Sequence, residues 1–231
     1  MNEIVVIIPV KDQLIYTEGI YEQLLHQRGV THVIILDNGS GERTKEWAER
    51  ESRTRPLFLT VIDADGKNIH EMWNMGIEKA LEFYHRPHIA ILNNDIKLGE
   101  DALLNMSNAL NHDDTLLAVC PNYDGRQLEG LQYTTEVCAG TYDGTGGLAG
   151  FAFMCPSELF NTCLYRFPEE LMWWCGDNDL VNSITSIQGR VAILGSATVE
   201  HLDGGENTGK WNYSDPVLVN DMNTFIQKWR S

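Results

Sequence analysis

The sequence predicts an α/β fold with a mostly parallel central sheet flanked by helices. Two patterns in the first 120 residues carry this prediction. Short, continuous apolar runs such as residues 4–9 (IVVIIP) are typical of strands that are buried on both faces. Stretches with a helical spacing of apolar residues lie between these runs. Regular alternation of strand and helix implies right-handed crossovers and a parallel sheet.

The individual elements follow from the same patterns. The expected strands of the first half cover residues 4–9, 33–36, 57–62, 89–92 and about 116–120, and the expected helices cover residues 15–28, 42–53, 69–84 and 100–111. After residue 121, Gly, Thr, Tyr and Asp become frequent, which indicates loops and a small antiparallel element. The later strands are expected at 150–155, 191–194 and 197–199, and the later helices at 156–163, 178–188 and 217–229.

Length and composition fit a single folded domain. A chain of 231 residues can bury one core, and 43% hydrophobic with 22% charged residues is ordinary for a folded protein. No apolar run approaches the ~20 residues that cross a bilayer, so we expect no integral membrane segment. The first apolar run has neither a basic region before it nor a cleavage site after it. A cytoplasmic location is therefore expected.

The charge balance restricts the possible partners. The formal net charge is −16, from 17 Lys and Arg against 33 Asp and Glu. This argues against nucleic acid as a partner, because binding to its phosphate backbone requires basic residues. An anionic ligand such as a diphosphate would also be repelled at long range. A divalent cation or well-placed backbone amides would have to offset that repulsion.

Small polar residues follow each of the first four expected strands. The four clusters are Pro9, Val10, Lys11 and Asp12; Asp37, Asn38, Gly39 and Ser40; Asp63, Ala64, Asp65, Gly66 and Asn68; and Asn93, Asn94 and Asp95. In a parallel sheet these clusters converge on one edge, where such sheets bind ligands. Neither a GxGxxG nor a Walker lysine motif occurs, so the edge offers acids and amides instead. That chemistry suits a ribose, a base edge and a hard cation.

Seven motifs occur in a characteristic order. They are IIPVKDQ (7–13), ILDNGS (35–40), NIHEMWNMGIEKA (68–80), ILNNDI (91–96), GGLAGFAFMCP (146–156), WWCGDNDL (173–180) and VEHLDGG (199–205). Together they resemble the inverting family 2 glycosyltransferases with a GT-A, Rossmann-like fold. The resemblance implies transfer of a sugar from a nucleotide-diphosphate donor, with UDP favoured, to a saccharide or other hydroxyl acceptor. Residues 1–120 would bind the donor and residues 121–231 the acceptor.

The resemblance also implies a metal site. In the family, an acidic triplet after the fourth strand holds the ion, and here only Asp95 of that triplet supplies a carboxylate. A histidine late in the chain often adds a ligand, and His201 matches it, although a purely structural histidine is the alternative. Mn²⁺ or Mg²⁺ would suit oxygen ligands, and a histidine nitrogen favours Mn²⁺.

The general base is expected in the WWCGDNDL motif. Anchoring the family pattern on Asp179 and Leu180 places Gly176 where the first acid usually stands and Asp177 where the second stands. Asp177 is then the candidate base, and Asp179 remains open for the same role. A simple helix N-cap is the alternative role for Asp177. Of the two preceding tryptophans, one is expected to stack on a sugar, and Trp174 is assigned to that role.

The remaining donor contacts come from the strand-end clusters. The resemblance implies that Asp37 and Asn38 contact the nucleoside and that Lys11 can reach a phosphate. The other expected donor-binding residues are Pro9, Val10, Gly66, Asn68, Asn74, Asn93 and Asn94. The loop 203–216 is expected either to close over the donor, with Trp211 inside, or to be an ordinary surface loop.

Two other functions stay open. A sugar nucleotidyltransferase would share the sheet, but it should carry a Gly-rich, Arg-containing loop after the first strand, and PVKDQ does not fit this description. A catalytically degenerate GT-A domain would act as a binding module. The Asn-Asn-Asp triplet and the missing acid at Gly176 keep that second alternative open.

Overall fold

The computed structural model describes residues 3–123, 125, 127–134, 147–202 and 215–229. The strands are β1 (Ile4–Val10), β2 (Val30–Asp37), β3 (Leu59–Asp63), β4 (His88–Leu92), β5 (Ile96–Leu98), β6 (Leu116–Asn122), β7 (Leu131–Thr134), β8 (Ala152–Pro156) and β9 (Arg190–His201). The helices are α1 (Leu14–Leu24), α2 (Glu42–Thr54), α3 (Ile69–Phe83), α4 (Ala102–His112), α5 (Glu158–Asn161), α6 (Gly176–Ser186) and α7 (Pro216–Trp229).

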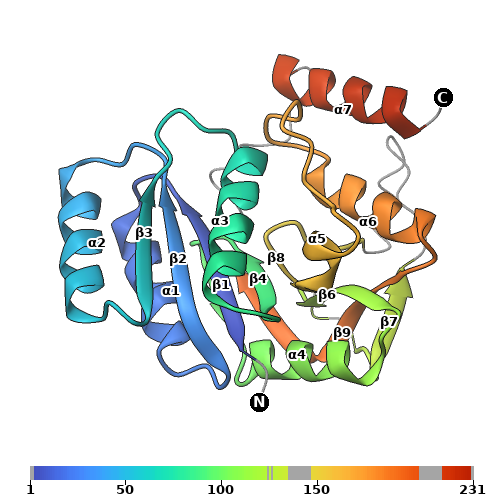
Figure 1. Ribbon diagram of the computed structural model, residues 1–231, viewed down its shortest axis with the longest axis horizontal. Helices are drawn as coiled ribbons and strands as arrows, with labels where there is room; N and C mark the ends of the chain where they lie inside the picture. The colour runs from blue at the N-terminus through green and yellow to red at the C-terminus, as the bar shows by residue number, and fades with distance from the viewer. Residues whose placement is uncertain (1–2, 124, 126, 135–146, 203–214, 230–231) are drawn as a thin grey trace.

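One mixed sheet organises the molecule (Figure 1). Its strands run in the order β3-β2-β1-β4-β8-β6-β9-β5, and β7 pairs with β9. The first four strands in this order, β3, β2, β1 and β4, are parallel to one another. β8 is antiparallel to both of its neighbours, and β5 and β7 are antiparallel to β9. The predicted α/β class, with a parallel sheet and an antiparallel element in the second half, is confirmed.

The centre of the sheet is buried on both faces because strands such as β1 are apolar at every position. Along β1, Ile4, Val6 and Ile8 pack into one core with residues of α1, α2 and α4. Val5 and Ile7 point the other way and pack with residues of α3, α5 and α6. Alternate side chains of a strand face opposite sides of the sheet, so a continuous apolar run produces two cores. The sequence pattern therefore predicted the layers correctly.

Two of the differences from the prediction concern strands near the expected metal ligands. The strands expected at 191–194 and 197–199 form one long strand, β9, which continues to His201. β5 was not expected, because three residues are too short to show a period. Helix α7 lies at one end of the molecule, beside α6 (Figure 1). Among the described residues, no helix is long and apolar enough to cross a membrane.

Candidate active site

The ends of β1 and β2 meet, as the strand-end clusters predicted. The Asn38 backbone N–H donates to the Val10 carbonyl (2.8 Å), and the Asp12 N–H donates to Ser40 Oγ (2.8 Å). Asp37 is buried, and its Oδ1 accepts from the Ser40 N–H at 2.9 Å. Pro9 and Val10 end β1 beside β2, and Lys11 follows them as an exposed side chain. A hollow of about 580 Å³ adjoins this edge, lined by residues 12–16 and 41–44.

Asn38 links the end of β2 to the turn after β3. Its Nδ2 donates to the Lys67 carbonyl at 3.0 Å, and its Oδ1 accepts from the Gly66 N–H at 3.1 Å. Gly66 has a φ of +74°, a conformation that glycine adopts without strain. The side chain of Asn38 therefore supports the shape of the expected donor edge, and this role was not predicted from the sequence.

Asp95 and His201 come together because β5 pairs with the end of β9. Ile96 stands opposite His201 in the register, and the Leu202 N–H donates to the Asp95 carbonyl at 2.8 Å. Asp95 Oδ1 and His201 Nε2 lie 3.2 Å apart. The two atoms are buried and form an ion pair when the imidazole is protonated, yet neither makes a hydrogen bond within the described residues.

This pair fits a divalent cation. Buried polar atoms are nearly always hydrogen-bonded, so two facing atoms that make no hydrogen bond among the described residues need another explanation. Adjacent ligands of an octahedral ion with ~2.1 Å bonds stand ~3 Å apart, which matches the observed separation. No cluster of three His, Cys, Asp or Glu occurs in the described part of the chain, so two protein ligands would leave positions for phosphate and water.

The neighbours of Asp95 in the triplet have other contacts. Asn94 is buried, and its Nδ2 donates to Thr17 Oγ1 of α1 at 3.1 Å. The Asn93 backbone N–H donates to the Phe151 carbonyl at 2.8 Å. The Asn94 amide thus anchors α1, while Asp95 carries the only carboxylate of the three.

Asp177 lies in the first turn of α6. The helix begins at Gly176, and Cys175 is the N-cap residue, so the alternative role of Asp177 as N-cap is wrong. Burial raises the pKa of Asp177 to about 6, and the backbone N–H groups of Asn178 and Gly150 partly oppose this rise. Asp177 Oδ1 accepts from the Asn178 N–H at 2.9 Å.

The base candidate and the cation pair flank one dipeptide. A Cβ added to Gly150 would lie 2.9 Å from Asp177 Oδ2, so the backbone at residue 150 touches this carboxylate. The next residue, Phe151, stacks on the His201 ring, with centroids 4.5 Å apart and planes inclined by 17°. Asp177 and His201 therefore each contact one of two consecutive residues, Gly150 and Phe151. The contact of Gly150 with Asp177 and the stacking of Phe151 on His201 were not predicted from the sequence.

The missing acid at Gly176 has a steric reason. A Cβ at Gly176 would stand 2.0 Å from His70 Nε2 and 3.1 Å from Trp73 Cζ3. His70 is fully buried and bonds through Nδ1 to the Leu171 carbonyl, and burial lowers its pKa. The imidazole occupies the space into which a side chain at 176 would grow. The departure from the family pattern is thus paired with His70 on α3, which sequence spacing did not reveal.

Asp179 is surrounded by donors. It is fully buried, and it accepts from Tyr165 Oη (3.1 Å) and Trp229 Nε1 (2.9 Å), and Lys228 Nζ lies 2.7 Å from its Oδ1. Trp229 and Lys228 belong to α7. Asp179 therefore joins α6 to the last helix, a role that a motif comparison cannot show.

The remaining expected residues lie around the segment that leads into α6. Asn68 caps α3 by accepting from the Glu71 N–H, and its Nδ2 donates to the Glu169 carbonyl. Asn74 binds both backbone polar groups of Phe167. Trp174 is partly buried, whereas its neighbour Trp173 is 50% exposed. Residues 203–214, including Trp211, and Gly146 lie outside the described part of the chain.

The arrangement of the sheet defines a class of protein, the glycosyltransferases of the GT-A fold. Within that class, the chain belongs to Glycosyl transferase family 2, whose sequence model matches residues 5–157, more than half of the chain. No curated protein matches the chain in sequence.

Two solved structures show the likeness of fold. One is GalNAc-T7 with UDP, GalNAc and Mn²⁺, with a TM-score of 0.73 and 12% identity over 97% of this chain and 48% of that one. The other is the mannosyltransferase PcManGT from Pyrobaculum calidifontis in complex with GDP-Man and Mn²⁺. Its TM-score is 0.67 and its identity 15%, over 96% of this chain and 68% of that one. The present chain thus spans about half the length of the first structure.

Proposed function

We propose that the protein transfers a sugar from a nucleotide-diphosphate donor to an acceptor hydroxyl, with a divalent cation and inversion at the anomeric carbon. One observation carries the proposal. Asp95 Oδ1 and His201 Nε2 face each other, buried and without hydrogen bonds among the described residues. Gly150 and Phe151 connect this pair to Asp177, a carboxylate whose pKa is raised to about 6. Family membership and the nucleotide and Mn²⁺ ligands named for the two similar structures support it.

The donor would bind at the edge formed by β1, β2 and β3. Asp37 and the backbone of Pro9 and Val10 would contact the nucleoside, and Lys11 would reach a phosphate. The side chain of Asn38, which is bonded to Gly66 and Lys67, would keep the edge in shape. UDP remains the favoured nucleotide, although GDP accompanies one of the two similar structures.

The cation would be held by Asp95 and His201. Mn²⁺ or Mg²⁺ bound there would neutralise the diphosphate leaving group. This also answers the charge problem of a chain with a net charge of −16, because an anionic donor would otherwise be repelled.

Asp177 would accept the proton of the acceptor hydroxyl. Its pKa of about 6 leaves it mostly ionised at pH 7, yet a stronger base than an ordinary carboxylate with a pKa of ~3.9. No enzyme nucleophile is required, because a single displacement inverts the centre. Trp174 was expected to stack on a sugar, but Trp173 is the more exposed of the two, so its indole would stack on the acceptor sugar instead. Asp179, surrounded by donors, would hold α6 in place.

A donor screen tests the proposal directly. UDP-, GDP- and dTDP-sugars are incubated with the protein and Mn²⁺, and release of the nucleoside diphosphate is measured. We expect release with at least one donor, its loss in EDTA and its loss in Asp95→Asn. Release that is insensitive to EDTA would exclude the metal role, and no release with any donor would exclude transfer.

The replaced acid at Gly176 supports a second candidate, a binding module without turnover. Thermal unfolding with Mn²⁺ and nucleoside diphosphates separates the two. A ligand at 100 times its dissociation constant should add ~2.7 kcal/mol to the free energy of unfolding. Stabilisation without any turnover would indicate the binding module. Pyrophosphate release from a nucleoside triphosphate and a sugar phosphate would instead indicate a nucleotidyltransferase.

A further inference from the structure

Helix α7 carries an acid on its buried face. Leu218, Asp221 and Phe225 are spaced three and four residues apart, and all three are buried. This spacing places Asp221 on the apolar stripe that docks the helix. A carboxylate is costly to bury unless it is fully hydrogen-bonded, so its partners should explain why it is there.

Three successive backbone amides bind this one carboxylate. Asp221 Oδ1 accepts from the Met172 N–H at 3.0 Å, and Oδ2 accepts from the N–H groups of Trp173 (2.8 Å) and Trp174 (3.0 Å). Hydrogen bonds to an ionised carboxylate are about twice as strong as neutral ones. The last helix thus holds a stretch of chain almost fifty residues earlier in the sequence.

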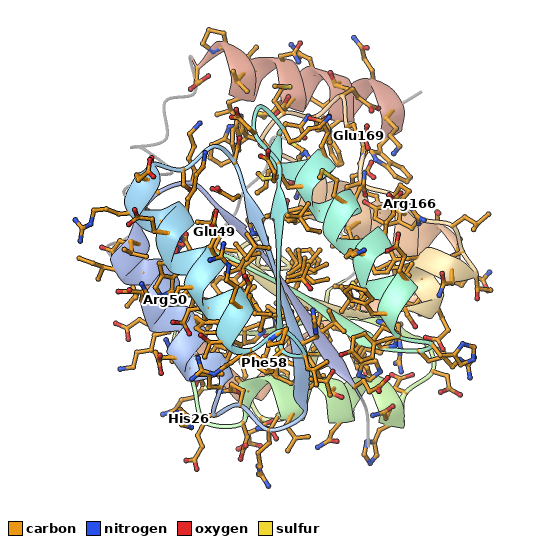
Figure 2. The ribbon with its side chains drawn as sticks, turned by 60° about the vertical axis from the view of Figure 1, so that its left-hand side comes forward. His26, Glu49, Arg50, Phe58, Arg166 and Glu169 are labelled. Carbon is orange, nitrogen blue, oxygen red and sulfur yellow. The ribbon has the colours of Figure 1, made fainter. Side chains whose placement is uncertain are left out.

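Helix α3 and its N-cap residue hold the same stretch through a second set of hydrogen bonds. Residues 167–175, here called the lead-in segment, connect the region after α5 to α6. The contacts from α3 are Asn74 to Phe167, Asn68 to the Glu169 carbonyl and His70 to the Leu171 carbonyl. Figure 2 shows Glu169 between the ends of α3 and α7. The lead-in segment is therefore held by hydrogen bonds from two helices, α3 and α7.

The lead-in segment ends directly at the proposed base. Only Cys175 and Gly176 separate the last amide bound by Asp221 from Asp177. Cys175 has a φ of +66°, and Gly176 packs against His70, so this connection has little freedom to absorb a displacement. Trp229 of α7 also binds Asp179 in the first turn of α6.

We propose that Asp221 is a positioning residue for the transfer reaction. By binding the amides of residues 172–174, it fixes where the Asp177 carboxylate and the Trp173 ring stand. The inference rests on the proposed function for its effect on rate. The hydrogen bonds between Asp221 and the three amides are present whether or not the proposed function is correct.

Asp221→Asn is the first test, because asparagine keeps the size but has one acceptor oxygen in place of two. We expect the kcat of transfer to fall at least ~10-fold, with the KM for the donor within ~2-fold of wild type. Hydrogen exchange at the amides of residues 172–174 should accelerate. Asp221→Glu, which keeps two acceptor oxygens, should retain more of the rate than Asp221→Asn.

Leu218→Ala is the matched control. It weakens the packing of α7 from the same buried face but leaves the carboxylate in place. We expect its kcat to stay within ~2-fold of wild type. An equal loss of kcat in Leu218→Ala would show that Asp221 only stabilises the helix. Unchanged kcat in Asp221→Asn, despite faster exchange at the three amides, would also overturn the proposal.

A carbon-13 NMR titration of Asp177 needs no turnover and separates this inference from the proposed function. The midpoint should move from about 6 towards the ordinary aspartate value in Asp221→Asn and stay in place in Leu218→Ala. An unmoved midpoint in Asp221→Asn would refute the positioning role even if the enzyme were active. A moved midpoint in a protein that turns over no donor would refute only the proposed function. If Asp221→Asn does not fold, Asp221→Glu should show the same changes to a smaller degree, and wild-type values there would refute the proposal.

Discussion

Two junctions in this molecule bury acidic side chains in opposite ways. Where β5 meets β9, Asp95 Oδ1 faces His201 Nε2 and neither atom has a hydrogen-bond partner among the described residues. Where α6 meets α7, Asp179 has three donors around it, and Asp221 accepts from three amides. The first junction leaves two facing polar atoms without hydrogen bonds among the described residues, whereas the carboxylates of the second have several donors each.

This difference in hydrogen bonding distinguishes a carboxylate that is available to bind a ligand from carboxylates that hold helices in place. A buried carboxylate oxygen that lacks a hydrogen bond lowers stability unless something binds to it, while a saturated carboxylate holds elements together. Substitutions at the two junctions should therefore have opposite signatures. At β5 and β9 activity should be lost with little loss of stability. At α6 and α7 substitution of Asp179 should cost stability first, while Asp221 is proposed to affect the rate through the segment that it holds.

The largest effect is expected for Asp95→Ala. Metal-dependent turnover should fall by ~10³-fold or more, because electrostatic stabilisation by a metal contributes several kcal/mol. Without metal, the free energy of unfolding should change little, since Oδ1 makes no hydrogen bond among the described residues and its neighbour His201 carries a charge only when protonated. Initial rates with Mn²⁺ and urea unfolding in EDTA measure the two effects. Glu49→Ala on α2 (Figure 2) removes a surface carboxylate as the control and should leave turnover unchanged.

Asp177→Asn should reduce turnover by ~10²- to 10³-fold while the protein becomes more stable. The folded pKa of about 6 lies above the unfolded value, so the folded state binds the extra proton between these values and stability falls as pH rises through them. Removing the charge should add ~1–3 kcal/mol at pH 7 and little near pH 4.

The rate of the wild-type enzyme checks the same pKa. Turnover should decline below pH 6 and be level above it, because only the ionised carboxylate accepts a proton. A pH-independent rate between pH 5 and 7, or a less stable Asp177→Asn protein at pH 7, would contradict this assignment.

Asp179→Ala should have the opposite signature. It leaves Tyr165 and Trp229 without their acceptor in a buried site, at a cost of ~2–4 kcal/mol. Urea unfolding measures the loss. Asp101→Ala, which breaks the ion pair with the exposed Arg28, is the control and should have a much smaller effect. If Asp179→Ala were stable but inactive, Asp179 rather than Asp177 would be the better candidate for the base.

The smallest effect is expected for Gly176→Ala. The new methyl group would meet His70 Nε2, at a cost of ~1–3 kcal/mol. Adding His70→Ala should remove much of this cost, so the two substitutions should be clearly non-additive in a double-mutant cycle. Additive effects on urea unfolding would show that the imidazole is not what excludes a side chain at 176.

Much of the fold could be predicted because its signals are local. The apolar run of β1, the helical spacing of α3 and the polar residues after each strand depend on neighbours in sequence, and the structure retains all three. α7 also carried a usable signal. An Asp between buried Leu218 and Phe225 breaks the apolar stripe, and such a break predicts a specific buried partner.

By itself, the sequence determined the layers, the two buried faces of the sheet and which edge carries acids and amides, because periodicity and strand order suffice for these. Only the tertiary structure decided that Asp95 meets His201 and that His70 fills the space beside Gly176. It also decided that Asp221 holds the segment before Asp177. These contacts join residues roughly 50 to 106 positions apart in the sequence. Such pairs leave no periodic trace, since they depend on how complete elements pack rather than on the residues beside them.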